Sequence, residues 1–201
     1  MRNLRKITAT TAVAVSTATL ALAAPAAAAP VGTAAVGYST RLIFDKNPAD
    51  PSNSRLYWRV YRVEDNGRQR KIVDVSWRAG SGIGVKNDCT RNKGWLPNGS
   101  YNITLHPSYN GSIIKGVAFR LNNKKCSAGT TTRTDLFIHS EMTRSGGQNR
   151  NVESQRWDGN GDYKSNGCIK LKPADIKSLA SHYKRYHPAS RTVTAKLTVV
   201  S

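Results

Sequence analysis

The sequence is poor in acidic residues, in cysteines and in long apolar runs. Its 201 residues contain 12 Asp and Glu against 31 Lys and Arg, which gives a formal net charge of +19. Such a balance favours encounter with polyanions but does not define a fold or a chemistry. The cations are scattered and form no nucleic-acid-binding motif, which argues against a specific nucleic-acid partner and favours adhesion to anionic envelope polymers. Ordinary solvated surface charge is the simpler alternative for most of them.

Only one stretch is long and apolar, and it lies at the N-terminus. Residues 7–24 follow a basic start and precede a run of small residues, an arrangement typical of a cleavable export signal. A membrane anchor is the alternative, but the run is short, rich in Ala and Thr, and lacks a stop-transfer charge cluster. We expect cleavage after Ala28, which removes residues 1–28 and three positive charges and leaves 19 − 3 = +16. The mature protein would then be secreted and associated with the cell wall.

The remaining chain lacks internal repeats and any sign of a second domain. Residues 29–37 are small and featureless, and we expect a flexible leader there. Residues 38–201 are long enough to form one domain around a single core. We expect a monomer.

Short β-runs separated by Gly, Asn and Pro dominate this domain. Apolar or alternating runs predict strands over residues 56–63, 72–77, 101–105, 113–121, 135–138 and 192–200. Asn66-Gly67 and Asn110-Gly111 each lie between two of these runs, and Asn-Gly favours tight β-hairpin turns. One helix is predicted from Pro173 to His187, because Ile176 and Leu179 recur at helical spacing. The result is a mainly β, mostly antiparallel domain with one helix.

Residues 140–164 contain few bulky side chains. A stretch this long without secondary structure is more typical of an active-site lid or a binding loop than of a plain connector. Surface disorder is the alternative. Within it, residues 158–162 resemble the start of a calcium loop, but the twelfth position is Ile169 rather than a bidentate Glu, so we interpret them as a turn.

The chain has only three cysteines, and this odd number is informative. In an oxidising compartment we expect Cys89 and Cys126 to form a disulfide, whose 37-residue loop would stabilise the fold by roughly 3–4 kcal/mol. Cys168 is then left as a free thiol. No Cys/His spacing supports zinc, and we expect neither a metal nor a cofactor.

Cys168 and His139 together could form an acyl-transfer site. His139 follows an apolar strand that would hold it rigidly, with a neighbouring carbonyl to fix its tautomer. Gly167 allows close backbone approach, and the amides of Gly167 and Cys168 could bind an oxyanion. From these residues alone, a buried structural Cys and a structural His remain an open alternative. His106, His182 and His187 have weaker claims to a catalytic role.

Three separated motifs then point to one family. Residues 165–171 match the pattern S-x-G-C-(I/V)-R-(L/M) except for Lys170, residues 96–103 are similar to T-P-x-G-x-Y-x-I, and residues 138–140 to I-H-G/S. Taken in their order along the chain, the three motifs resemble those of the YkuD-type L,D-transpeptidases. The resemblance covers residues 55–179.

The resemblance implies a β-sandwich or barrel whose nucleophile is Cys168 and whose base is His139, acting on peptidoglycan stem peptides. Release of D-Ala would lead to a 3→3 cross-link or, with water, to a trimmed stem. Further site residues implied are Gly167, Ser165 and Ser140, which would shape the site, and Lys170 and Asn166, which would bind substrate.

The chain departs from the family pattern at four points. Asn166 stands where His is frequent, Ser140 replaces a common Gly, and Lys170 replaces Arg, which binds carboxylates more directionally. The interval of 168 − 139 = 29 residues between His139 and Cys168 is longer than usual, which indicates an insertion in the loop.

Two alternatives to this enzyme remain. A catalytically silent, basic wall-binding or inhibitory module would keep the fold without turnover, although retention of both Cys168 and His139 argues against it. A cysteine amidase or endopeptidase of the NlpC/P60 kind would place the nucleophile before the histidine, whereas here His139 comes first.

Overall fold

The structure is a computed structural model that describes residues 37–188 and 195–201. The chain divides into two units, residues 1–33 and 34–201, and all described residues belong to the second. The predicted export signal, most of the predicted leader and residues 189–194 lie outside the described residues. Within the described part, no helix is long and apolar enough to cross a membrane.

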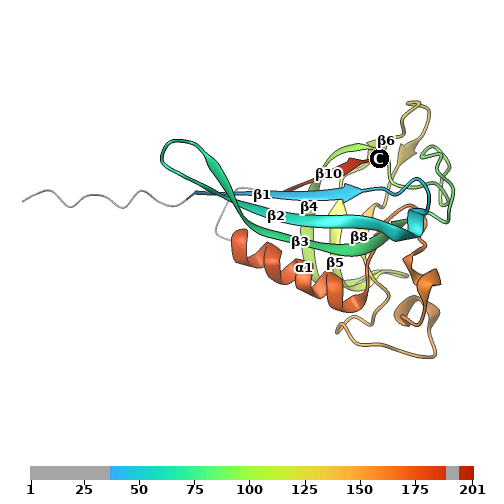
Figure 1. The fold of residues 1–201 in the computed structure, drawn as a ribbon. Helices are drawn as coiled ribbons and strands as arrows, with labels where there is room; N and C mark the ends of the chain where they lie inside the picture. The colour runs from blue at the N-terminus through green and yellow to red at the C-terminus, as the bar shows by residue number, and fades with distance from the viewer. Residues whose placement is uncertain (1–36, 189–194) are drawn as a thin grey trace, which may run out of the picture. The chain divides into compact units, whose positions relative to one another are not determined.

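Eight strands form a closed barrel in the order β1-β10-β4-β5-β8-β9-β3-β2 (Figure 1). Their bounds are β1 Gly37–Asp45, β2 Ser54–Val63, β3 Gln69–Ser81, β4 Gly99–Asn110, β5 Lys115–Leu121, β8 Phe137–His139, β9 Ile169–Lys170 and β10 Lys196–Val200. A separate two-stranded sheet pairs β6, Lys124–Lys125, with β7, Thr132–Arg133. The barrel is mixed but mostly antiparallel, because only β1 with β10 and β8 with β9 run parallel. The predicted mainly β fold is confirmed.

Both predicted hairpins form. β2 and β3 pair on either side of a turn in which Gly67 has φ 78°, the left-handed conformation that glycine adopts without a steric penalty. β4 and β5 pair across the second turn, at Asn110-Gly111. His106, which precedes Pro107, lies within β4 at a shift in register between His106 and Tyr109. Such an irregularity accommodates a proline, which has no N–H for the ladder.

The core lies inside the barrel and is built by alternation along the strands. In β2, Leu56, Trp58 and Val60 are fully buried while the residues between them face outward. β1 was not predicted, because only Leu42 and Phe44 near its end are buried and the rest of the strand carries little apolar pattern.

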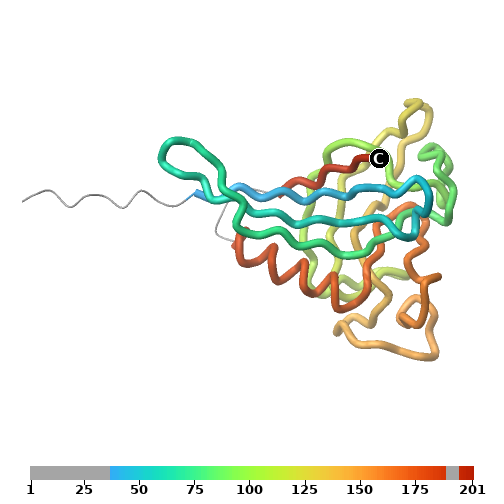
Figure 2. The backbone as a smooth tube through the Cα atoms, in the orientation of Figure 1, coloured from blue at the N-terminus to red at the C-terminus, as the bar shows by residue number. Residues whose placement is uncertain are grey.

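Helix α1 runs from Pro173 to Tyr186, as predicted, and His187 follows as its C-cap. Ile176 and Leu179 are fully buried in the main core, and the helix contacts β5. Figure 2 shows the helix running alongside the sheet, and along the chain it follows β9. The helix therefore holds the chain immediately downstream of Cys168 against the barrel.

The loop of residues 140–164 contains two 3-10 helices, η2 Glu153–Gln155 and η3 Asn160–Tyr163. The Asp162 carboxylate accepts hydrogen bonds from the amides of Asp158 and Gly159, at 2.7 and 2.8 Å. The predicted turn at residues 158–162 is thus confirmed, and this carboxylate closes it. A third 3-10 helix, η1, spans Pro51–Asn53 and leads into β2.

Candidate active site

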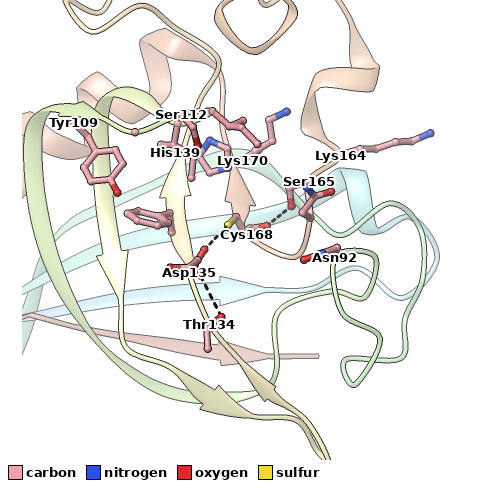
Figure 3. Close-up of a pocket in the computed structure, with 15 residues that line it drawn as sticks. Asn92, Tyr109, Ser112, Thr134, Asp135, His139, Lys164, Ser165, Cys168 and Lys170 are labelled. Atoms are coloured by element: carbon pink, nitrogen blue, oxygen red, sulfur yellow. Dashed lines mark hydrogen bonds between the residues drawn. The ribbon is translucent and has the colours of Figure 1, made fainter.

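The fold brings the two predicted catalytic residues onto neighbouring strands. β8 and β9 run parallel, with Ile138 opposite Ile169, so His139 ends β8 while Cys168 lies immediately before β9. Both residues line a cavity of about 450 Å³ (Figure 3). The cavity also receives Asn166, Ser165 and Lys170, so the residues of the two motifs meet at one site.

His139 is buried and held in one tautomer. Its Nδ1 lies 3.2 Å from the carbonyl oxygen of Ser140. Because a carbonyl oxygen can only accept, Nδ1 carries the hydrogen and Nε2 keeps its lone pair. Burial and, to a smaller extent, the Lys170 cation lower the pKa of His139 to about 3, while the hydrogen bond to Ser140 acts in the opposite direction. The imidazole is therefore neutral at physiological pH and able to accept a proton.

Cys168 is the free cysteine of the described chain and only 7% exposed. Its thiol donates to the Asp135 carbonyl oxygen at 3.5 Å. Burial raises the pKa of Cys168 to about 11, while a hydrogen bond with the backbone of Phe137 and, after it, the cations Arg133 and Lys170 act in the opposite direction. At rest the site thus holds a neutral thiol and a neutral imidazole rather than an ion pair.

Ser165 closes the turn that presents Cys168. Its hydroxyl donates to the Cys168 carbonyl at 2.6 Å and accepts from the amides of Gly82 and Gly167 at 3.2 and 3.3 Å. The Gly167 amide therefore already has an acceptor. The amide of Cys168 has no hydrogen-bond partner among the described residues, so it is the better candidate of the two expected oxyanion donors.

The remaining predicted residues have clear positions. Ser140 supplies the carbonyl that orients His139, while its own hydroxyl is buried without a partner in the described part of the chain. Asn166 lines the cavity, and its carbonyl oxygen accepts a hydrogen bond from Arg133. Asn166 thus lines the cavity, whereas Ser140 is not among its lining residues and contacts the site through His139.

Lys170 also lines the cavity, but its ammonium already has a partner. It forms a buried ion pair and a hydrogen bond with Glu141. The side chain of Lys170 is 8% exposed and that of Glu141 is 12% exposed. Burial raises the pKa of Glu141, and Lys170 opposes the shift. The second carboxylate oxygen of Glu141 is buried and has no partner among the described residues. A substrate carboxylate would therefore have to compete with Glu141 for Lys170.

Sequence reasoning missed Glu141, Arg133 and Asp135. Glu141 lies two residues after His139, but no motif marks it. Arg133 is one of many scattered cations, and its burial is invisible in the sequence. Asp135 adopts φ 54°, a left-handed conformation uncommon for a residue other than glycine and frequent at functional sites.

The predicted disulfide between Cys89 and Cys126 is formed. Asp88 has an oxygen close to both sulfurs, a grouping that could in principle hold a metal. Thiolates bind metals, whereas the sulfurs of a disulfide are already bonded to each other. The donor set therefore fits a covalent crosslink and not a metal ion.

Comparison with known proteins identifies the family of the chain. Residues 49–194 match the model of the YkuD family, described as an L,D-transpeptidase catalytic domain. No curated protein matches the chain. Among solved structures, the chain is similar to the helical cell shape determining protein Pgp2 from Campylobacter jejuni, with 18% identity and a TM-score of 0.43 over 82% of this chain. The match spans 49% of that protein, about half of its length. On the family match, which covers more than half of the sequence, this chain belongs to the YkuD family of L,D-transpeptidase catalytic domains.

Proposed function

We propose that the protein is a secreted cysteine transpeptidase that acts on peptidoglycan stem peptides, with Cys168 as nucleophile and His139 as base. The observation that carries this proposal is the meeting of the two residues on parallel neighbouring strands at one cavity. Family membership supports activity on peptidoglycan. The cavity is large enough for a segment of a peptide, because small-molecule sites typically enclose roughly 300–1,000 Å³.

In the first half-reaction, Cys168 attacks the carbonyl carbon between diaminopimelate and D-Ala. His139 takes the thiol proton on Nε2 as the C–S bond forms, so the high pKa of the thiol does not require a free thiolate in advance. The amide of Cys168 donates to the oxyanion. Collapse breaks the C–N bond, His139 returns the proton to the leaving amine, and D-Ala departs, leaving a thioester.

In the second half-reaction, the amine of another stem attacks the thioester. The neutral imidazole of His139 takes a proton from this amine as the C–N bond forms. Collapse then breaks the C–S bond, His139 returns the proton to the sulfur of Cys168, and the product is a 3→3 cross-link. If water attacks instead, the product is a trimmed stem. The chemistry requires no cofactor, since every proton transfer is assigned to His139.

The setting of this reaction is also a proposal. The N-terminal signal pattern supports export, and the net charge of 19 − 3 = +16 that remains after the expected cleavage supports adhesion of a monomeric enzyme to anionic wall polymers. Both features come from the sequence alone.

The test is incubation of the mature protein with a purified tetrapeptide stem, followed by mass spectrometry of the peptide. We expect release of D-Ala, with a dimer or a tripeptide as product. Cys168→Ala and His139→Gln should each lower the rate by about a thousandfold or more. A folded wild-type protein that leaves the stem intact would favour the catalytically silent wall-binding module.

A further inference from the structure

Arg133 is a buried cation that packs against the nucleophile turn, the turn of residues 165–168 that presents Cys168. It is only 3% exposed, and it extends from β7 beneath Gly167. A Cβ atom on Gly167 would overlap the Arg133 guanidinium and approach the Gly94 carbonyl oxygen to 2.8 Å. Gly167 also has φ 101°. The glycine of the signature thus allows the cation to pack against the backbone that carries Cys168.

The guanidinium binds the backbone through four carbonyl oxygens. Nη1 donates to Asp88 at 2.7 Å and to Trp95 at 3.4 Å, and Nη2 donates to Gly94 and to Asn166, both at 3.3 Å. Three of the acceptors belong to residues 88–95, and the fourth belongs to the nucleophile turn. Arg133 therefore joins these two segments, which are distant in sequence.

The charge of Arg133 is not neutralised by an ion pair. Among the described residues, no carboxylate lies within salt-bridge distance of it. The nearby Asp88 carboxylate instead accepts from the amide and the hydroxyl of Ser127 at 3.0 and 2.7 Å. A buried charge without a carboxylate partner is unfavourable for stability. Charges that shift the pKa of a neighbouring group are concentrated at functional sites. Here the field favours the thiolate of Cys168, whose pKa Arg133 lowers.

The disulfide fixes both sides of this contact. Cys89 lies within residues 88–95, which supply three acceptors, and Cys126 directly follows β6, which pairs with β7 through Lys124 and Arg133. The crosslink thus connects the segment that accepts the hydrogen bonds to the hairpin that carries the donor.

We propose that Arg133 is a positioning residue for Cys168: held by the Cys89–Cys126 crosslink, it fixes the peptide of Asn166 and Gly167 and supplies positive field to the thiol. The inference deepens the proposed function and rests on it for turnover, but its effect on the Cys168 thiol is independent of substrate. Arg133 touches no reacting atom and acts through the turn.

The experiment compares Arg133→Met and Arg133→Lys with wild type. Alkylation of Cys168 by iodoacetamide is followed from pH 7 to 10, together with kcat and KM on the tetrapeptide stem. Since a rise of one unit in thiol pKa reduces the thiolate fraction tenfold, Arg133→Met should slow alkylation at pH 8 by about tenfold and lower kcat by at least as much. Arg133→Lys keeps the charge but not the planar fork, so alkylation should stay within about threefold while kcat falls.

The matched control is Arg62→Met, which removes an exposed arginine from β2 and should change neither readout. A purely structural role for Arg133 would lower the thermal midpoint and leave the alkylation profile of the folded protein unchanged. Folded Arg133→Met protein with alkylation and kcat within twofold of wild type would overturn the proposal.

A second variant covers the case in which Arg133→Met does not fold. Cys89→Ser combined with Cys126→Ser keeps Arg133 but releases its acceptors, and it should slow both alkylation of Cys168 and turnover by several fold. Wild-type values in this folded variant would also overturn the proposal. If alkylation responds as expected but wild type does not turn over the stem, the proposed function fails while the role of Arg133 at the thiol stands.

Discussion

Two buried cations flank the nucleophile, and they are held in opposite ways. Lys170 in β9 is neutralised by an ion pair with Glu141, whereas Arg133 in β7 is bound only by backbone carbonyls in the described part of the chain. Both lower the pKa of Cys168. Only Lys170 is identified as acting on His139, whose pKa it lowers.

The difference separates two tasks. The Lys170–Glu141 pair carries no net charge and joins the ends of β8 and β9. His139 stays neutral mainly because it is buried, and Lys170 adds a smaller effect. Arg133 retains its charge. Its hydrogen bond to the Asn166 carbonyl fixes the turn of Cys168, and no carboxylate in the described part of the chain cancels its positive field. The variants below separate these tasks, from the largest expected effect to the smallest.

Glu141→Gln should have the largest effect on stability. It leaves the ammonium of Lys170 buried without its partner, and breaking a buried pair in this way costs about 3–5 kcal/mol. Urea unfolding measures the loss. The control is Glu153→Gln, which breaks an ion pair with Arg156 at a side chain that is 72% exposed and should leave stability nearly unchanged. Equal losses of unfolding free energy at the two sites would show that solvent screens the Lys170–Glu141 pair as strongly as it screens the exposed pair.

The stability of wild type should fall in acid partly because of His139. Its folded pKa, about 3, lies below the unfolded value, so the neutral form contributes stability that is complete above about pH 6.5 and is lost as the pH falls toward 3. Unfolding free energies measured from pH 7 to 4 should drop by a few kcal/mol more in wild type than in His139→Gln. Parallel curves would mean that His139 titrates normally in the folded protein.

Alkylation of Cys168 should follow a thiol with a raised pKa. Because that pKa is about 11, the rate with iodoacetamide should rise about tenfold per pH unit from pH 7 to 9, without a plateau. A plateau near neutral pH would indicate a resting thiolate–imidazolium pair and would contradict the neutral site described above.

Lys170→Arg should have the smallest effect. A guanidinium can bind both carboxylate oxygens, including the buried Glu141 oxygen that has no partner among the described residues. Unfolding free energy should therefore stay within about 1 kcal/mol of wild type or increase slightly. A loss as large as that of Glu141→Gln would show that the space around Glu141 does not admit the larger group.

Much of the framework follows from local sequence. Asn66-Gly67 and Asn110-Gly111 predicted hairpins, because their backbone preference is local, and β2 was visible through its alternation. Cysteine counting predicted the disulfide. The order of His139 and Cys168 agreed with the family, although their meeting depends on the parallel pairing of β8 and β9, strands of three and two residues that are too short to show a period.

The charged surroundings of the site could not be predicted in the same way. Glu141 and Lys170 are 29 positions apart, and Arg133 contacts residues up to 45 positions away. Such pairings depend on tertiary packing, and nothing in a sequence with 31 Lys and Arg distinguishes a buried cation from a solvated one. The family resemblance implies that Lys170 binds substrate, and its ion pair with Glu141 is evident only in the folded chain.

The most direct test of the central claim is the intact mass of the mature protein after incubation with a carbapenem, beside a Cys168→Ala control. Attack of the thiol on the β-lactam carbonyl opens the ring without a leaving fragment, so we predict a gain of one drug mass in wild type and none in Cys168→Ala. A folded wild-type protein that gains no mass, or an adduct that persists in Cys168→Ala, would contradict the assignment of Cys168 as the nucleophile.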